Sequence, residues 1–335
     1  MVVSRKINSL LSPLDLCIVR KSVLYEWQTG ETGERAQELR LPEGASEYLV
    51  IDNPRLRELR ERYAGFQARA SVPIVWTDEY VQSYGLQAFR GDNCYVWQTK
   101  DPNCDEINYC LTAYYAQAID RLGVLEKNSE DGLFGVHTYP IYSRDFSRDL
   151  LDSTIELNFL EKHLNLSSRE HLNILDIGAG YGRLAHRTAT TLSNLSTYFC
   201  TDAVPESTFL SEYHIRFRNL EDRVTVVPLD EIEERIREQD IDLAVNIHSF
   251  SECSLEAIEW WLALLAAGKV RNLFIVPNSS DHGGEKLALN SGEDFSALVE
   301  KYGYILKLKT PKYEDPLVQK FAVSPTYYYL YQLGD

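Results

Sequence analysis

After about residue 168 the sequence alternates between short apolar runs and stretches with helical periodicity. Strands are predicted at 173–177, 197–201, 224–227, 243–247 and 273–276, with helices between them at about 183–195, 206–218, 230–238 and 254–267. Such alternation favours a parallel sheet with helices on both faces. Two further strand-like runs, 304–308 and 327–331, have only a polar loop between them and predict an antiparallel hairpin at one sheet edge.

The chain before this alternation has a different pattern. Apolar residues at helical spacing predict one helix after Asn53-Pro54, a second over about 106–122 and a third over about 150–164, joined by irregular chain. A length of 335 residues is comfortable for two domains. We therefore predict a mainly helical cap region at 1–150 and an α/β domain at 151–335.

The turn that follows the first predicted strand of this domain is rich in glycine. It runs Asp-Ile-Gly-Ala-Gly-Tyr-Gly over 176–182 and opens a helical stretch. Glycine permits positive φ and lets a ligand approach the backbone, and a helix N-terminus offers free N–H groups. Dinucleotide enzymes use Gly-x-Gly-x-x-Gly, but here the third glycine, Gly182, comes one position too early.

The spacing Asp-x-Gly-x-Gly-x-Gly from Asp176 to Gly182 instead resembles the S-adenosylmethionine motif of class I methyltransferases. That resemblance implies a mostly parallel, seven-stranded, Rossmann-like sheet. It also places Asp176 near the ammonium group of the cofactor and lets Gly178, Gly180 and Gly182 pack closely against it. A dinucleotide oxidoreductase, or a glycine turn that binds no ligand, is the alternative.

Two more acids follow predicted strands. Asp202 ends the second strand, where a carboxylate can accept hydrogen bonds from both ribose hydroxyls, and Ala203 beside it is expected in the same site. The alternative role for Asp202 is at the N-terminus of the next helix. Asp230 follows the third strand, where the methyltransferase pattern has a group that meets the adenine amino group, but it suits an N-cap of the helix 231–238 equally well.

The loop after the fourth predicted strand, 246–252, is expected to face the transferred methyl group, since ligands of open α/β sheets bind beyond the carboxyl ends of the strands. It lacks the Asn/Asp-Pro-Pro-aromatic signature of nitrogen methylation, which favours an oxygen acceptor. We predict Asn246 in the cofactor site and His248 as the base, because imidazole titrates near neutral pH. Glu252 would orient His248 or bind substrate. Asp281-His282 is the second candidate for the base, and a plain pocket-lining or solvated loop role is the alternative for both histidines.

Charge and composition exclude several classes of partner. A net charge of −16, a pI of about 4.9 and the lack of a basic patch disfavour nucleic acid. The longest apolar run, 260–276, is interrupted by Lys269 and Arg271, and the start of the chain lacks a signal-peptide pattern, so we predict a cytoplasmic protein without a membrane partner. The 6 cysteines form no Cys-x-x-Cys pair, and no metal site is predicted. The oligomeric state is left open, a homo-oligomer included.

A narrower resemblance covers about residue 75 to the end of the chain. Its blocks lie at 89–93 (FRGDN), 130–136 (EDGLFGV), 147–153 (SRDLLDS), 202–206 (DAVPE) and 248–252 (HSFSE). They resemble blocks of a bacterial sugar O-methyltransferase family. This implies methylation of a hydroxyl on a small molecule, a sugar or glycosylated natural product. The alternatives are a non-sugar acceptor, or a methyltransferase-like protein that binds the cofactor without turnover.

The same resemblance implies roles for residues outside the sheet. Arg148, Asp149 and Ser153 would cover the cofactor as part of a lid, and Arg90 and Asp92 would reach the substrate from the helical region. The residues themselves also allow a second interpretation. Asp149 would then cap the predicted helix 150–164, and Arg90 would form an ion pair that holds a loop.

Overall fold

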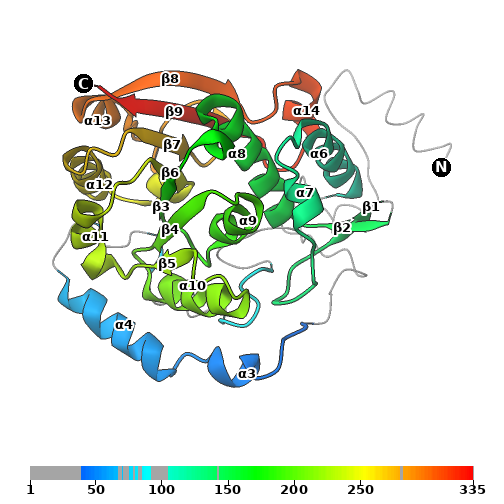
Figure 1. Ribbon diagram of the computed structural model, residues 1–335, viewed down its shortest axis with the longest axis horizontal. Helices are drawn as coiled ribbons and strands as arrows, with labels where there is room; N and C mark the ends of the chain where they lie inside the picture. Colours follow the sequence, from blue (N-terminus) through cyan, green and yellow to red (C-terminus); the bar gives the residue numbers. More distant parts are fainter. Residues whose placement is uncertain are drawn as a thin grey trace, which may run out of the picture.

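The computed structural model describes residues 39–66, 70, 75–77, 80–81, 85–91, 105–141, 143–279 and 282–334. A seven-stranded sheet lies at its centre, in the order β5-β4-β3-β6-β7-β9-β8 (Figure 1). Its strands are β3 (Leu172–Ile177), β4 (Leu195–Thr201), β5 (Val224–Val226), β6 (Leu243–Ile247), β7 (Asn272–Val276), β8 (Tyr304–Pro311) and β9 (Tyr327–Leu333). The first five are parallel, and β9 runs antiparallel to both β7 and β8. The predicted α/β class, with a mostly parallel sheet and a C-terminal hairpin, is confirmed.

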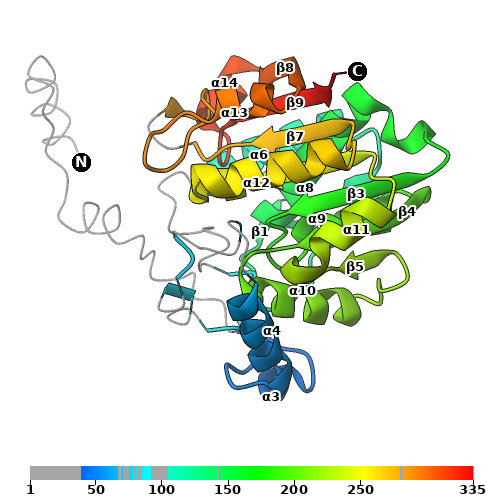
Figure 2. The same ribbon diagram turned by 90° about the vertical axis from the view of Figure 1, so that its left-hand side faces the viewer.

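Helices cover both faces of the sheet, because successive strand residues point to opposite faces and both faces of these strands are apolar. Helices α8 (Arg148–Leu164) and α9 (Arg183–Thr191) contribute to one hydrophobic cluster. Helices α11 (Ile232–Glu238), α12 (Leu255–Ala267) and α13 (Ser296–Lys301) contribute to the other (Figure 2). Helix α10 (Pro205–Phe217) follows β4 and contacts both β4 and β5.

The connection between β8 and β9 differs from the prediction. A short helix, α14 (Pro316–Phe321), stands where a helix-free polar loop was expected. Its start is well formed locally: Asp315 accepts hydrogen bonds from the N–H groups of Leu317 and Val318, and Pro316 occupies the first turn. With 6 residues, the helix is too short to leave a clear periodic pattern in the sequence.

The described part of the N-terminal half contains two expected helices, α4 (Pro54–Gly65) and α6 (Glu106–Ile119), and three elements that were not predicted. Two of these are single-turn helices, α3 (Ala45–Tyr48) and α7 (Val124–Lys127). As predicted, Asn53 caps α4, where its Oδ1 accepts from the N–H of Arg55 at 2.9 Å. The third unpredicted element is a small hairpin of β1 (Tyr139–Ile141) and β2 (Arg144–Phe146).

Both hydrophobic clusters contain residues from each side of residue 150. Leu56 and Leu59 of α4 belong to the cluster of α11 and α12, while Tyr109 and Ala113 of α6 belong to that of α8 and α9. The division at residue 150 stays a prediction; in the structure, α8 runs across it. In the described ranges no helix has both the length and the apolar character needed to cross a bilayer.

Candidate active site

A cavity of about 790 Å³ lies beyond the carboxyl ends of β3, β4 and β6. This volume is in the usual range for small-molecule and cofactor sites, roughly 300–1,000 Å³. Its wall contains residues of the glycine turn and of the segments after β4, β6 and β7, together with Ala70, Val75, Trp76 and Tyr80 from the N-terminal half. The site is therefore built from both halves of the chain.

The three glycines of the turn share a backbone conformation but have different surroundings. All of them have positive φ: 76° at Gly178, 56° at Gly180 and 81° at Gly182. A Cβ on Gly178 would lie 2.3 Å from the Oγ of Ser249, so this position needs glycine for the approach of the segment after β6. Gly182 is the N-cap of α9 and lies outside the cavity lining, whereas Gly178 and Gly180 line it.

Asp176 is a buried carboxyl on β3 that faces this cavity. Its side chain is 4% exposed and accepts a hydrogen bond from the hydroxyl of Tyr198 at 2.9 Å. Burial raises its pKa to about 7, although the bond from Tyr198 and the charge of Arg183 act in the opposite direction. A ligand cation would favour the charged form of this group.

Asp202 stands at the end of β4 in contact with the glycine turn. Its carboxylate accepts from the N–H of Gly180 at 3.0 Å and from that of Val204 at 2.9 Å. Burial raises the pKa of Asp202 to about 7, and the charge of Glu252 raises it further. Ala203 and Val204, which follow it, also line the cavity.

Two arginines of the cavity wall are held by carboxylates of α8. Arg148 donates from Nε to Asp152 at 3.2 Å, and Arg183 donates to Glu156 at 2.8 and 3.1 Å. The expected role of Arg148 in covering the cofactor stays a prediction. The cap of α8 is Ser147, whose Oγ accepts from the N–H of Leu150, so the alternative that Asp149 caps this helix is wrong.

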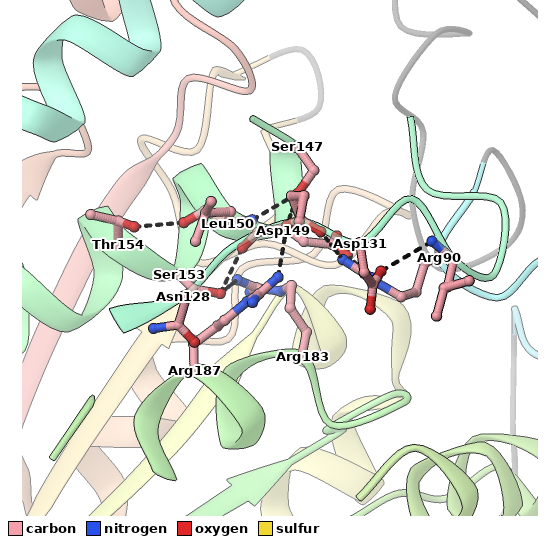
Figure 3. Close-up of polar contacts among 12 residues, drawn as sticks. Arg90, Asn128, Asp131, Ser147, Asp149, Leu150, Ser153, Thr154, Arg183 and Arg187 are labelled. Atoms are coloured by element: carbon pink, nitrogen blue, oxygen red, sulfur yellow. Dashed lines mark hydrogen bonds and ion pairs between the residues drawn. The ribbon is translucent and has the colours of Figure 1, made fainter. Parts of the chain in front are cut away.

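Asp149 belongs instead to a buried ionic network that includes Arg90 (Figure 3). Arg90 is 1% exposed, and its guanidinium group contacts three carboxylates, those of Glu130 at 2.6 Å, Asp131 at 3.1 Å and Asp149 at 3.2 Å. The hydroxyl of Tyr181, in the glycine turn, also donates to Asp149. Arg90 thus forms the ion pair of the second interpretation and holds the turn; Asp92 lies outside the described residues.

His248 follows β6 and lines the cavity. Its Nδ1 lies 3.3 Å from the carbonyl oxygen of Pro277, which assigns the neutral tautomer with Nδ1–H as donor and leaves Nε2 as an acceptor. Burial, and then the charge of Arg148, lower its pKa to about 3. Asn246 is outside the cavity lining: its amide donates to the carbonyl of Ile177 and its Oδ1 accepts from the N–H of Phe250.

Glu252 lines the cavity and is held by a residue from the N-terminal half. Its Oε2 accepts from Nε1 of Trp76 at 2.6 Å, and its Oε1 accepts from Nδ2 of Asn278 at 3.1 Å. Burial raises its pKa. These partners replace the expected contact with His248. Trp76 was not identified from the sequence, because nothing in the residues around it marks a contact with a loop so far along the chain.

Helix α4 covers the ends of β4 and β5, and this changes the interpretation of Asp230. The carboxylate of Asp230 accepts from Arg62 at 2.9 and 2.8 Å, outside the cavity lining. Asp230 does not cap the helix, so that alternative is wrong. Its pairing with Arg62 leaves the carboxylate outside the cavity in which the expected adenine contact would be made. Tyr63 lies beside it: its hydroxyl is 3.1 Å from the carbonyl of Asp202 and accepts from the N–H of Leu229 at 3.0 Å.

His282 is also outside the cavity lining, although Gly283 next to it is part of that wall. Both ring nitrogens of His282 are buried and have no hydrogen-bond partner among the described residues. Asp281, its expected partner, lies outside the described residues. The pair therefore stays a prediction.

No protein-family model matches the sequence, and a search of curated proteins finds no match. Among solved structures, the 4+2 cyclase SpnF is similar over 66% of this chain and 93% of its own, with 14% identity and a TM-score of 0.42. A SAM-dependent methyltransferase from Aquifex aeolicus is similar over 55% and 98%, with 14% identity and a TM-score of 0.39. TrmK from M. capricolum, in complex with S-adenosylhomocysteine, is similar over 53% and 67%, with 16% identity and a TM-score of 0.35.

At these TM-scores the similarities assign no activity. The class of fold is defined by the chain itself: a strand order of β5-β4-β3-β6-β7-β9-β8, an antiparallel β9, and a glycine turn between β3 and α9. This is the Rossmann-like fold of class I methyltransferases. The expected fold class is therefore confirmed.

Proposed function

We propose that this chain is an S-adenosylmethionine-dependent methyltransferase that methylates a hydroxyl of a small molecule. The observation that carries the proposal is a pair of carboxyls, the buried Asp176 and the partly buried Asp202, which line one cavity on either side of a glycine turn. The pKa of each is raised to about 7, so both would be stabilised by a ligand that brings positive charge and hydrogen-bond donors.

The residues present fit S-adenosylmethionine. Asp176 would take its ammonium group, Asp202 and Ala203 would lie against its ribose, and Arg148 and Arg183 would stand near its carboxylate. When bound, this cofactor supplies a methyl group activated by a sulfonium. It carries no phosphate, which suits a cavity whose two arginines are already paired with Asp152 and Glu156. A dinucleotide would bring a pyrophosphate to the same acidic wall.

His248 is proposed to orient the acceptor hydroxyl and to take its proton. In the tautomer assigned above, Nε2 offers a lone pair while Nδ1–H is used by Pro277. A pKa of about 3 makes a weak base, but the acceptor oxygen becomes far more acidic than an imidazolium as it gains a methyl group. Positioning of the hydroxyl and removal of its proton are therefore within reach of this neutral side chain.

The acceptor is proposed to be a sugar or a glycosylated small molecule. Support comes from the resemblance of the five sequence blocks, and from the aromatic side chain of Tyr80 in the cavity wall, which suits the apolar face of a sugar ring. The net charge of −16 disfavours nucleic acid. A non-sugar acceptor, or cofactor binding without turnover, is the alternative.

Calorimetry with S-adenosylhomocysteine tests the cofactor assignment. Asp202→Ala is expected to weaken binding by about 1–3 kcal/mol, the value of a hydrogen bond to a charged group. Asp222→Ala, which removes an exposed acid, is the matched control and should bind like wild type. No heat with the wild-type protein, or stronger binding of NADH than of S-adenosylhomocysteine, would contradict the proposal.

A transfer assay tests the acceptor class. Methyl-labelled cofactor is incubated with the protein and a cell extract, and the product is then treated with nuclease or protease. Label that stays in small molecules after both treatments is expected. Label released by nuclease would instead identify a nucleic-acid substrate, and cofactor binding without any labelled product would favour the binding-protein alternative.

A further inference from the structure

Glu252 is a carboxyl that the proposed methyl-transfer step does not use. It ends the 3-10 helix η5 (Ser249–Glu252), lines the same cavity as Asp202, and is fixed by N–H donors from Trp76 and Asn278. Both donors are neutral, and no salt bridge to Glu252 is formed by the residues that the structure describes. Its free lone pairs are available to a donor on a ligand.

Glu252 and Cys253 line the same cavity as Asp202. The charge of Glu252 raises the pKa of Asp202, and burial followed by the charges of both acids raises the pKa of the Cys253 thiol to about 12. The two arginines of the wall, Arg148 and Arg183, pair instead with Asp152 and Glu156 of α8. Neither arginine forms an ion pair with Glu252 or Asp202 among the described residues.

The cavity wall also has apolar members. Ala203 and Val204 follow Asp202 in the chain, and Ala257 and Trp261 belong to α12, the helix that follows Glu252. A flat, weakly polar ring fits such a wall, with one polar contact at its edge. If Asp202 holds the ribose of the cofactor, the base attached to that ribose is one bond away from it and enters this part of the cavity.

We propose that Glu252 accepts a hydrogen bond from the exocyclic amino group of the cofactor's adenine. This inference rests on the proposed function and deepens it, since it names the residue that reads the base. The role was expected of Asp230, but the bidentate pair with Arg62 holds that carboxylate away from the cavity. Glu252 reaches the base from the opposite side, after β6 rather than after β5.

Trp76 is the positioning residue for Glu252. Its indole N–H occupies Oε2 at 2.6 Å, and Asn278 occupies Oε1 at 3.1 Å, so the carboxylate has one orientation available. Because Trp76 comes from the N-terminal half, that half completes the base pocket. The preference for adenine thus depends on a contact that spans 176 positions of the sequence.

The test compares two probes that differ only at the base: S-adenosylhomocysteine and S-inosylhomocysteine, which has an oxygen in place of the amino group. Calorimetry on the full-length wild-type protein is expected to show at least roughly tenfold tighter binding of the adenosyl compound. Glu252→Gln should reduce this preference to less than about threefold, because an amide also donates to the inosine oxygen. Trp76→Phe, which keeps a ring but removes the N–H, should give an intermediate preference.

Asp230→Asn is the matched control and should keep the wild-type preference. The ratio of the two dissociation constants is the measurement, because a general loosening of the fold weakens both probes and cancels. A wild-type preference in Glu252→Gln, or its loss in Asp230→Asn, overturns the assignment while the proposed function stands. A wild-type protein that binds neither probe overturns the proposed function and this inference together.

Discussion

The buried carboxyl of Asp176 is expected to lower the stability of this protein when it is ionised and no ligand is bound. Replacing it with asparagine removes the charge but keeps an acceptor for the hydroxyl of Tyr198, which lies 2.9 Å away. We predict that Asp176→Asn raises the free energy of unfolding at alkaline pH. The same change should weaken binding of S-adenosylhomocysteine, because the ammonium group of the ligand loses its carboxylate.

The size of this effect follows from the two pKa values. In the unfolded chain the carboxyl ionises near 3.9, whereas in the folded protein burial raises its pKa to about 7. Between these values the folded state holds a proton that the unfolded state has lost, so stability falls as the pH rises from about 4 to 7. The cost is about 1–2 kcal/mol at pH 5 and about 4 kcal/mol at pH 8.

Urea unfolding at pH 5 and pH 8 measures this cost. The advantage of Asp176→Asn over wild type should grow by about 2–3 kcal/mol between the two pH values. Any packing penalty of the amide is the same at both and drops out of the comparison. Asp222→Asn, at an exposed site, should show no such change. An advantage that is equal at pH 5 and pH 8 would refute the argument that burial of this carboxyl is what raises its pKa.

Two further predictions concern other parts of the site. His248→Ala should abolish methyl transfer while the affinity for S-adenosylhomocysteine stays within a few-fold, because the proposed role of this side chain is toward the acceptor. Unchanged turnover in the variant would remove His248 from this role. Tyr63→Phe leaves the buried N–H of Leu229 without its acceptor, so urea unfolding should show a free energy of unfolding lower by about 1–3 kcal/mol. Arg57→Ala, on the exposed side of α4, is the control. Equal stability of the two variants would contradict the role of this hydroxyl.

The fold and the centre of the site could be predicted because they depend on local patterns. Strands β3 to β7 and the helices between them follow from apolar runs and helical spacing along neighbouring residues. The glycine turn could be predicted from the sequence, because glycine is the residue that adopts positive φ most readily, as Gly178 and Gly180 do. Asp176 and Asp202 meet in one cavity because parallel strands bring their carboxyl ends to the same edge of the sheet. Sequence order alone determines that much.

The partners of the charged side chains were decided by the tertiary structure. Asp230 and Arg62 are 168 positions apart, and Glu252 and Trp76 are 176 apart. Nothing in the spacing of residues marks such pairs, since a carboxylate binds whichever donor the packing of distant elements places beside it. Desolvation has the same origin. The pKa values near 7 of Asp176 and Asp202, and the low pKa of His248, therefore exist only once the folded chain buries these groups.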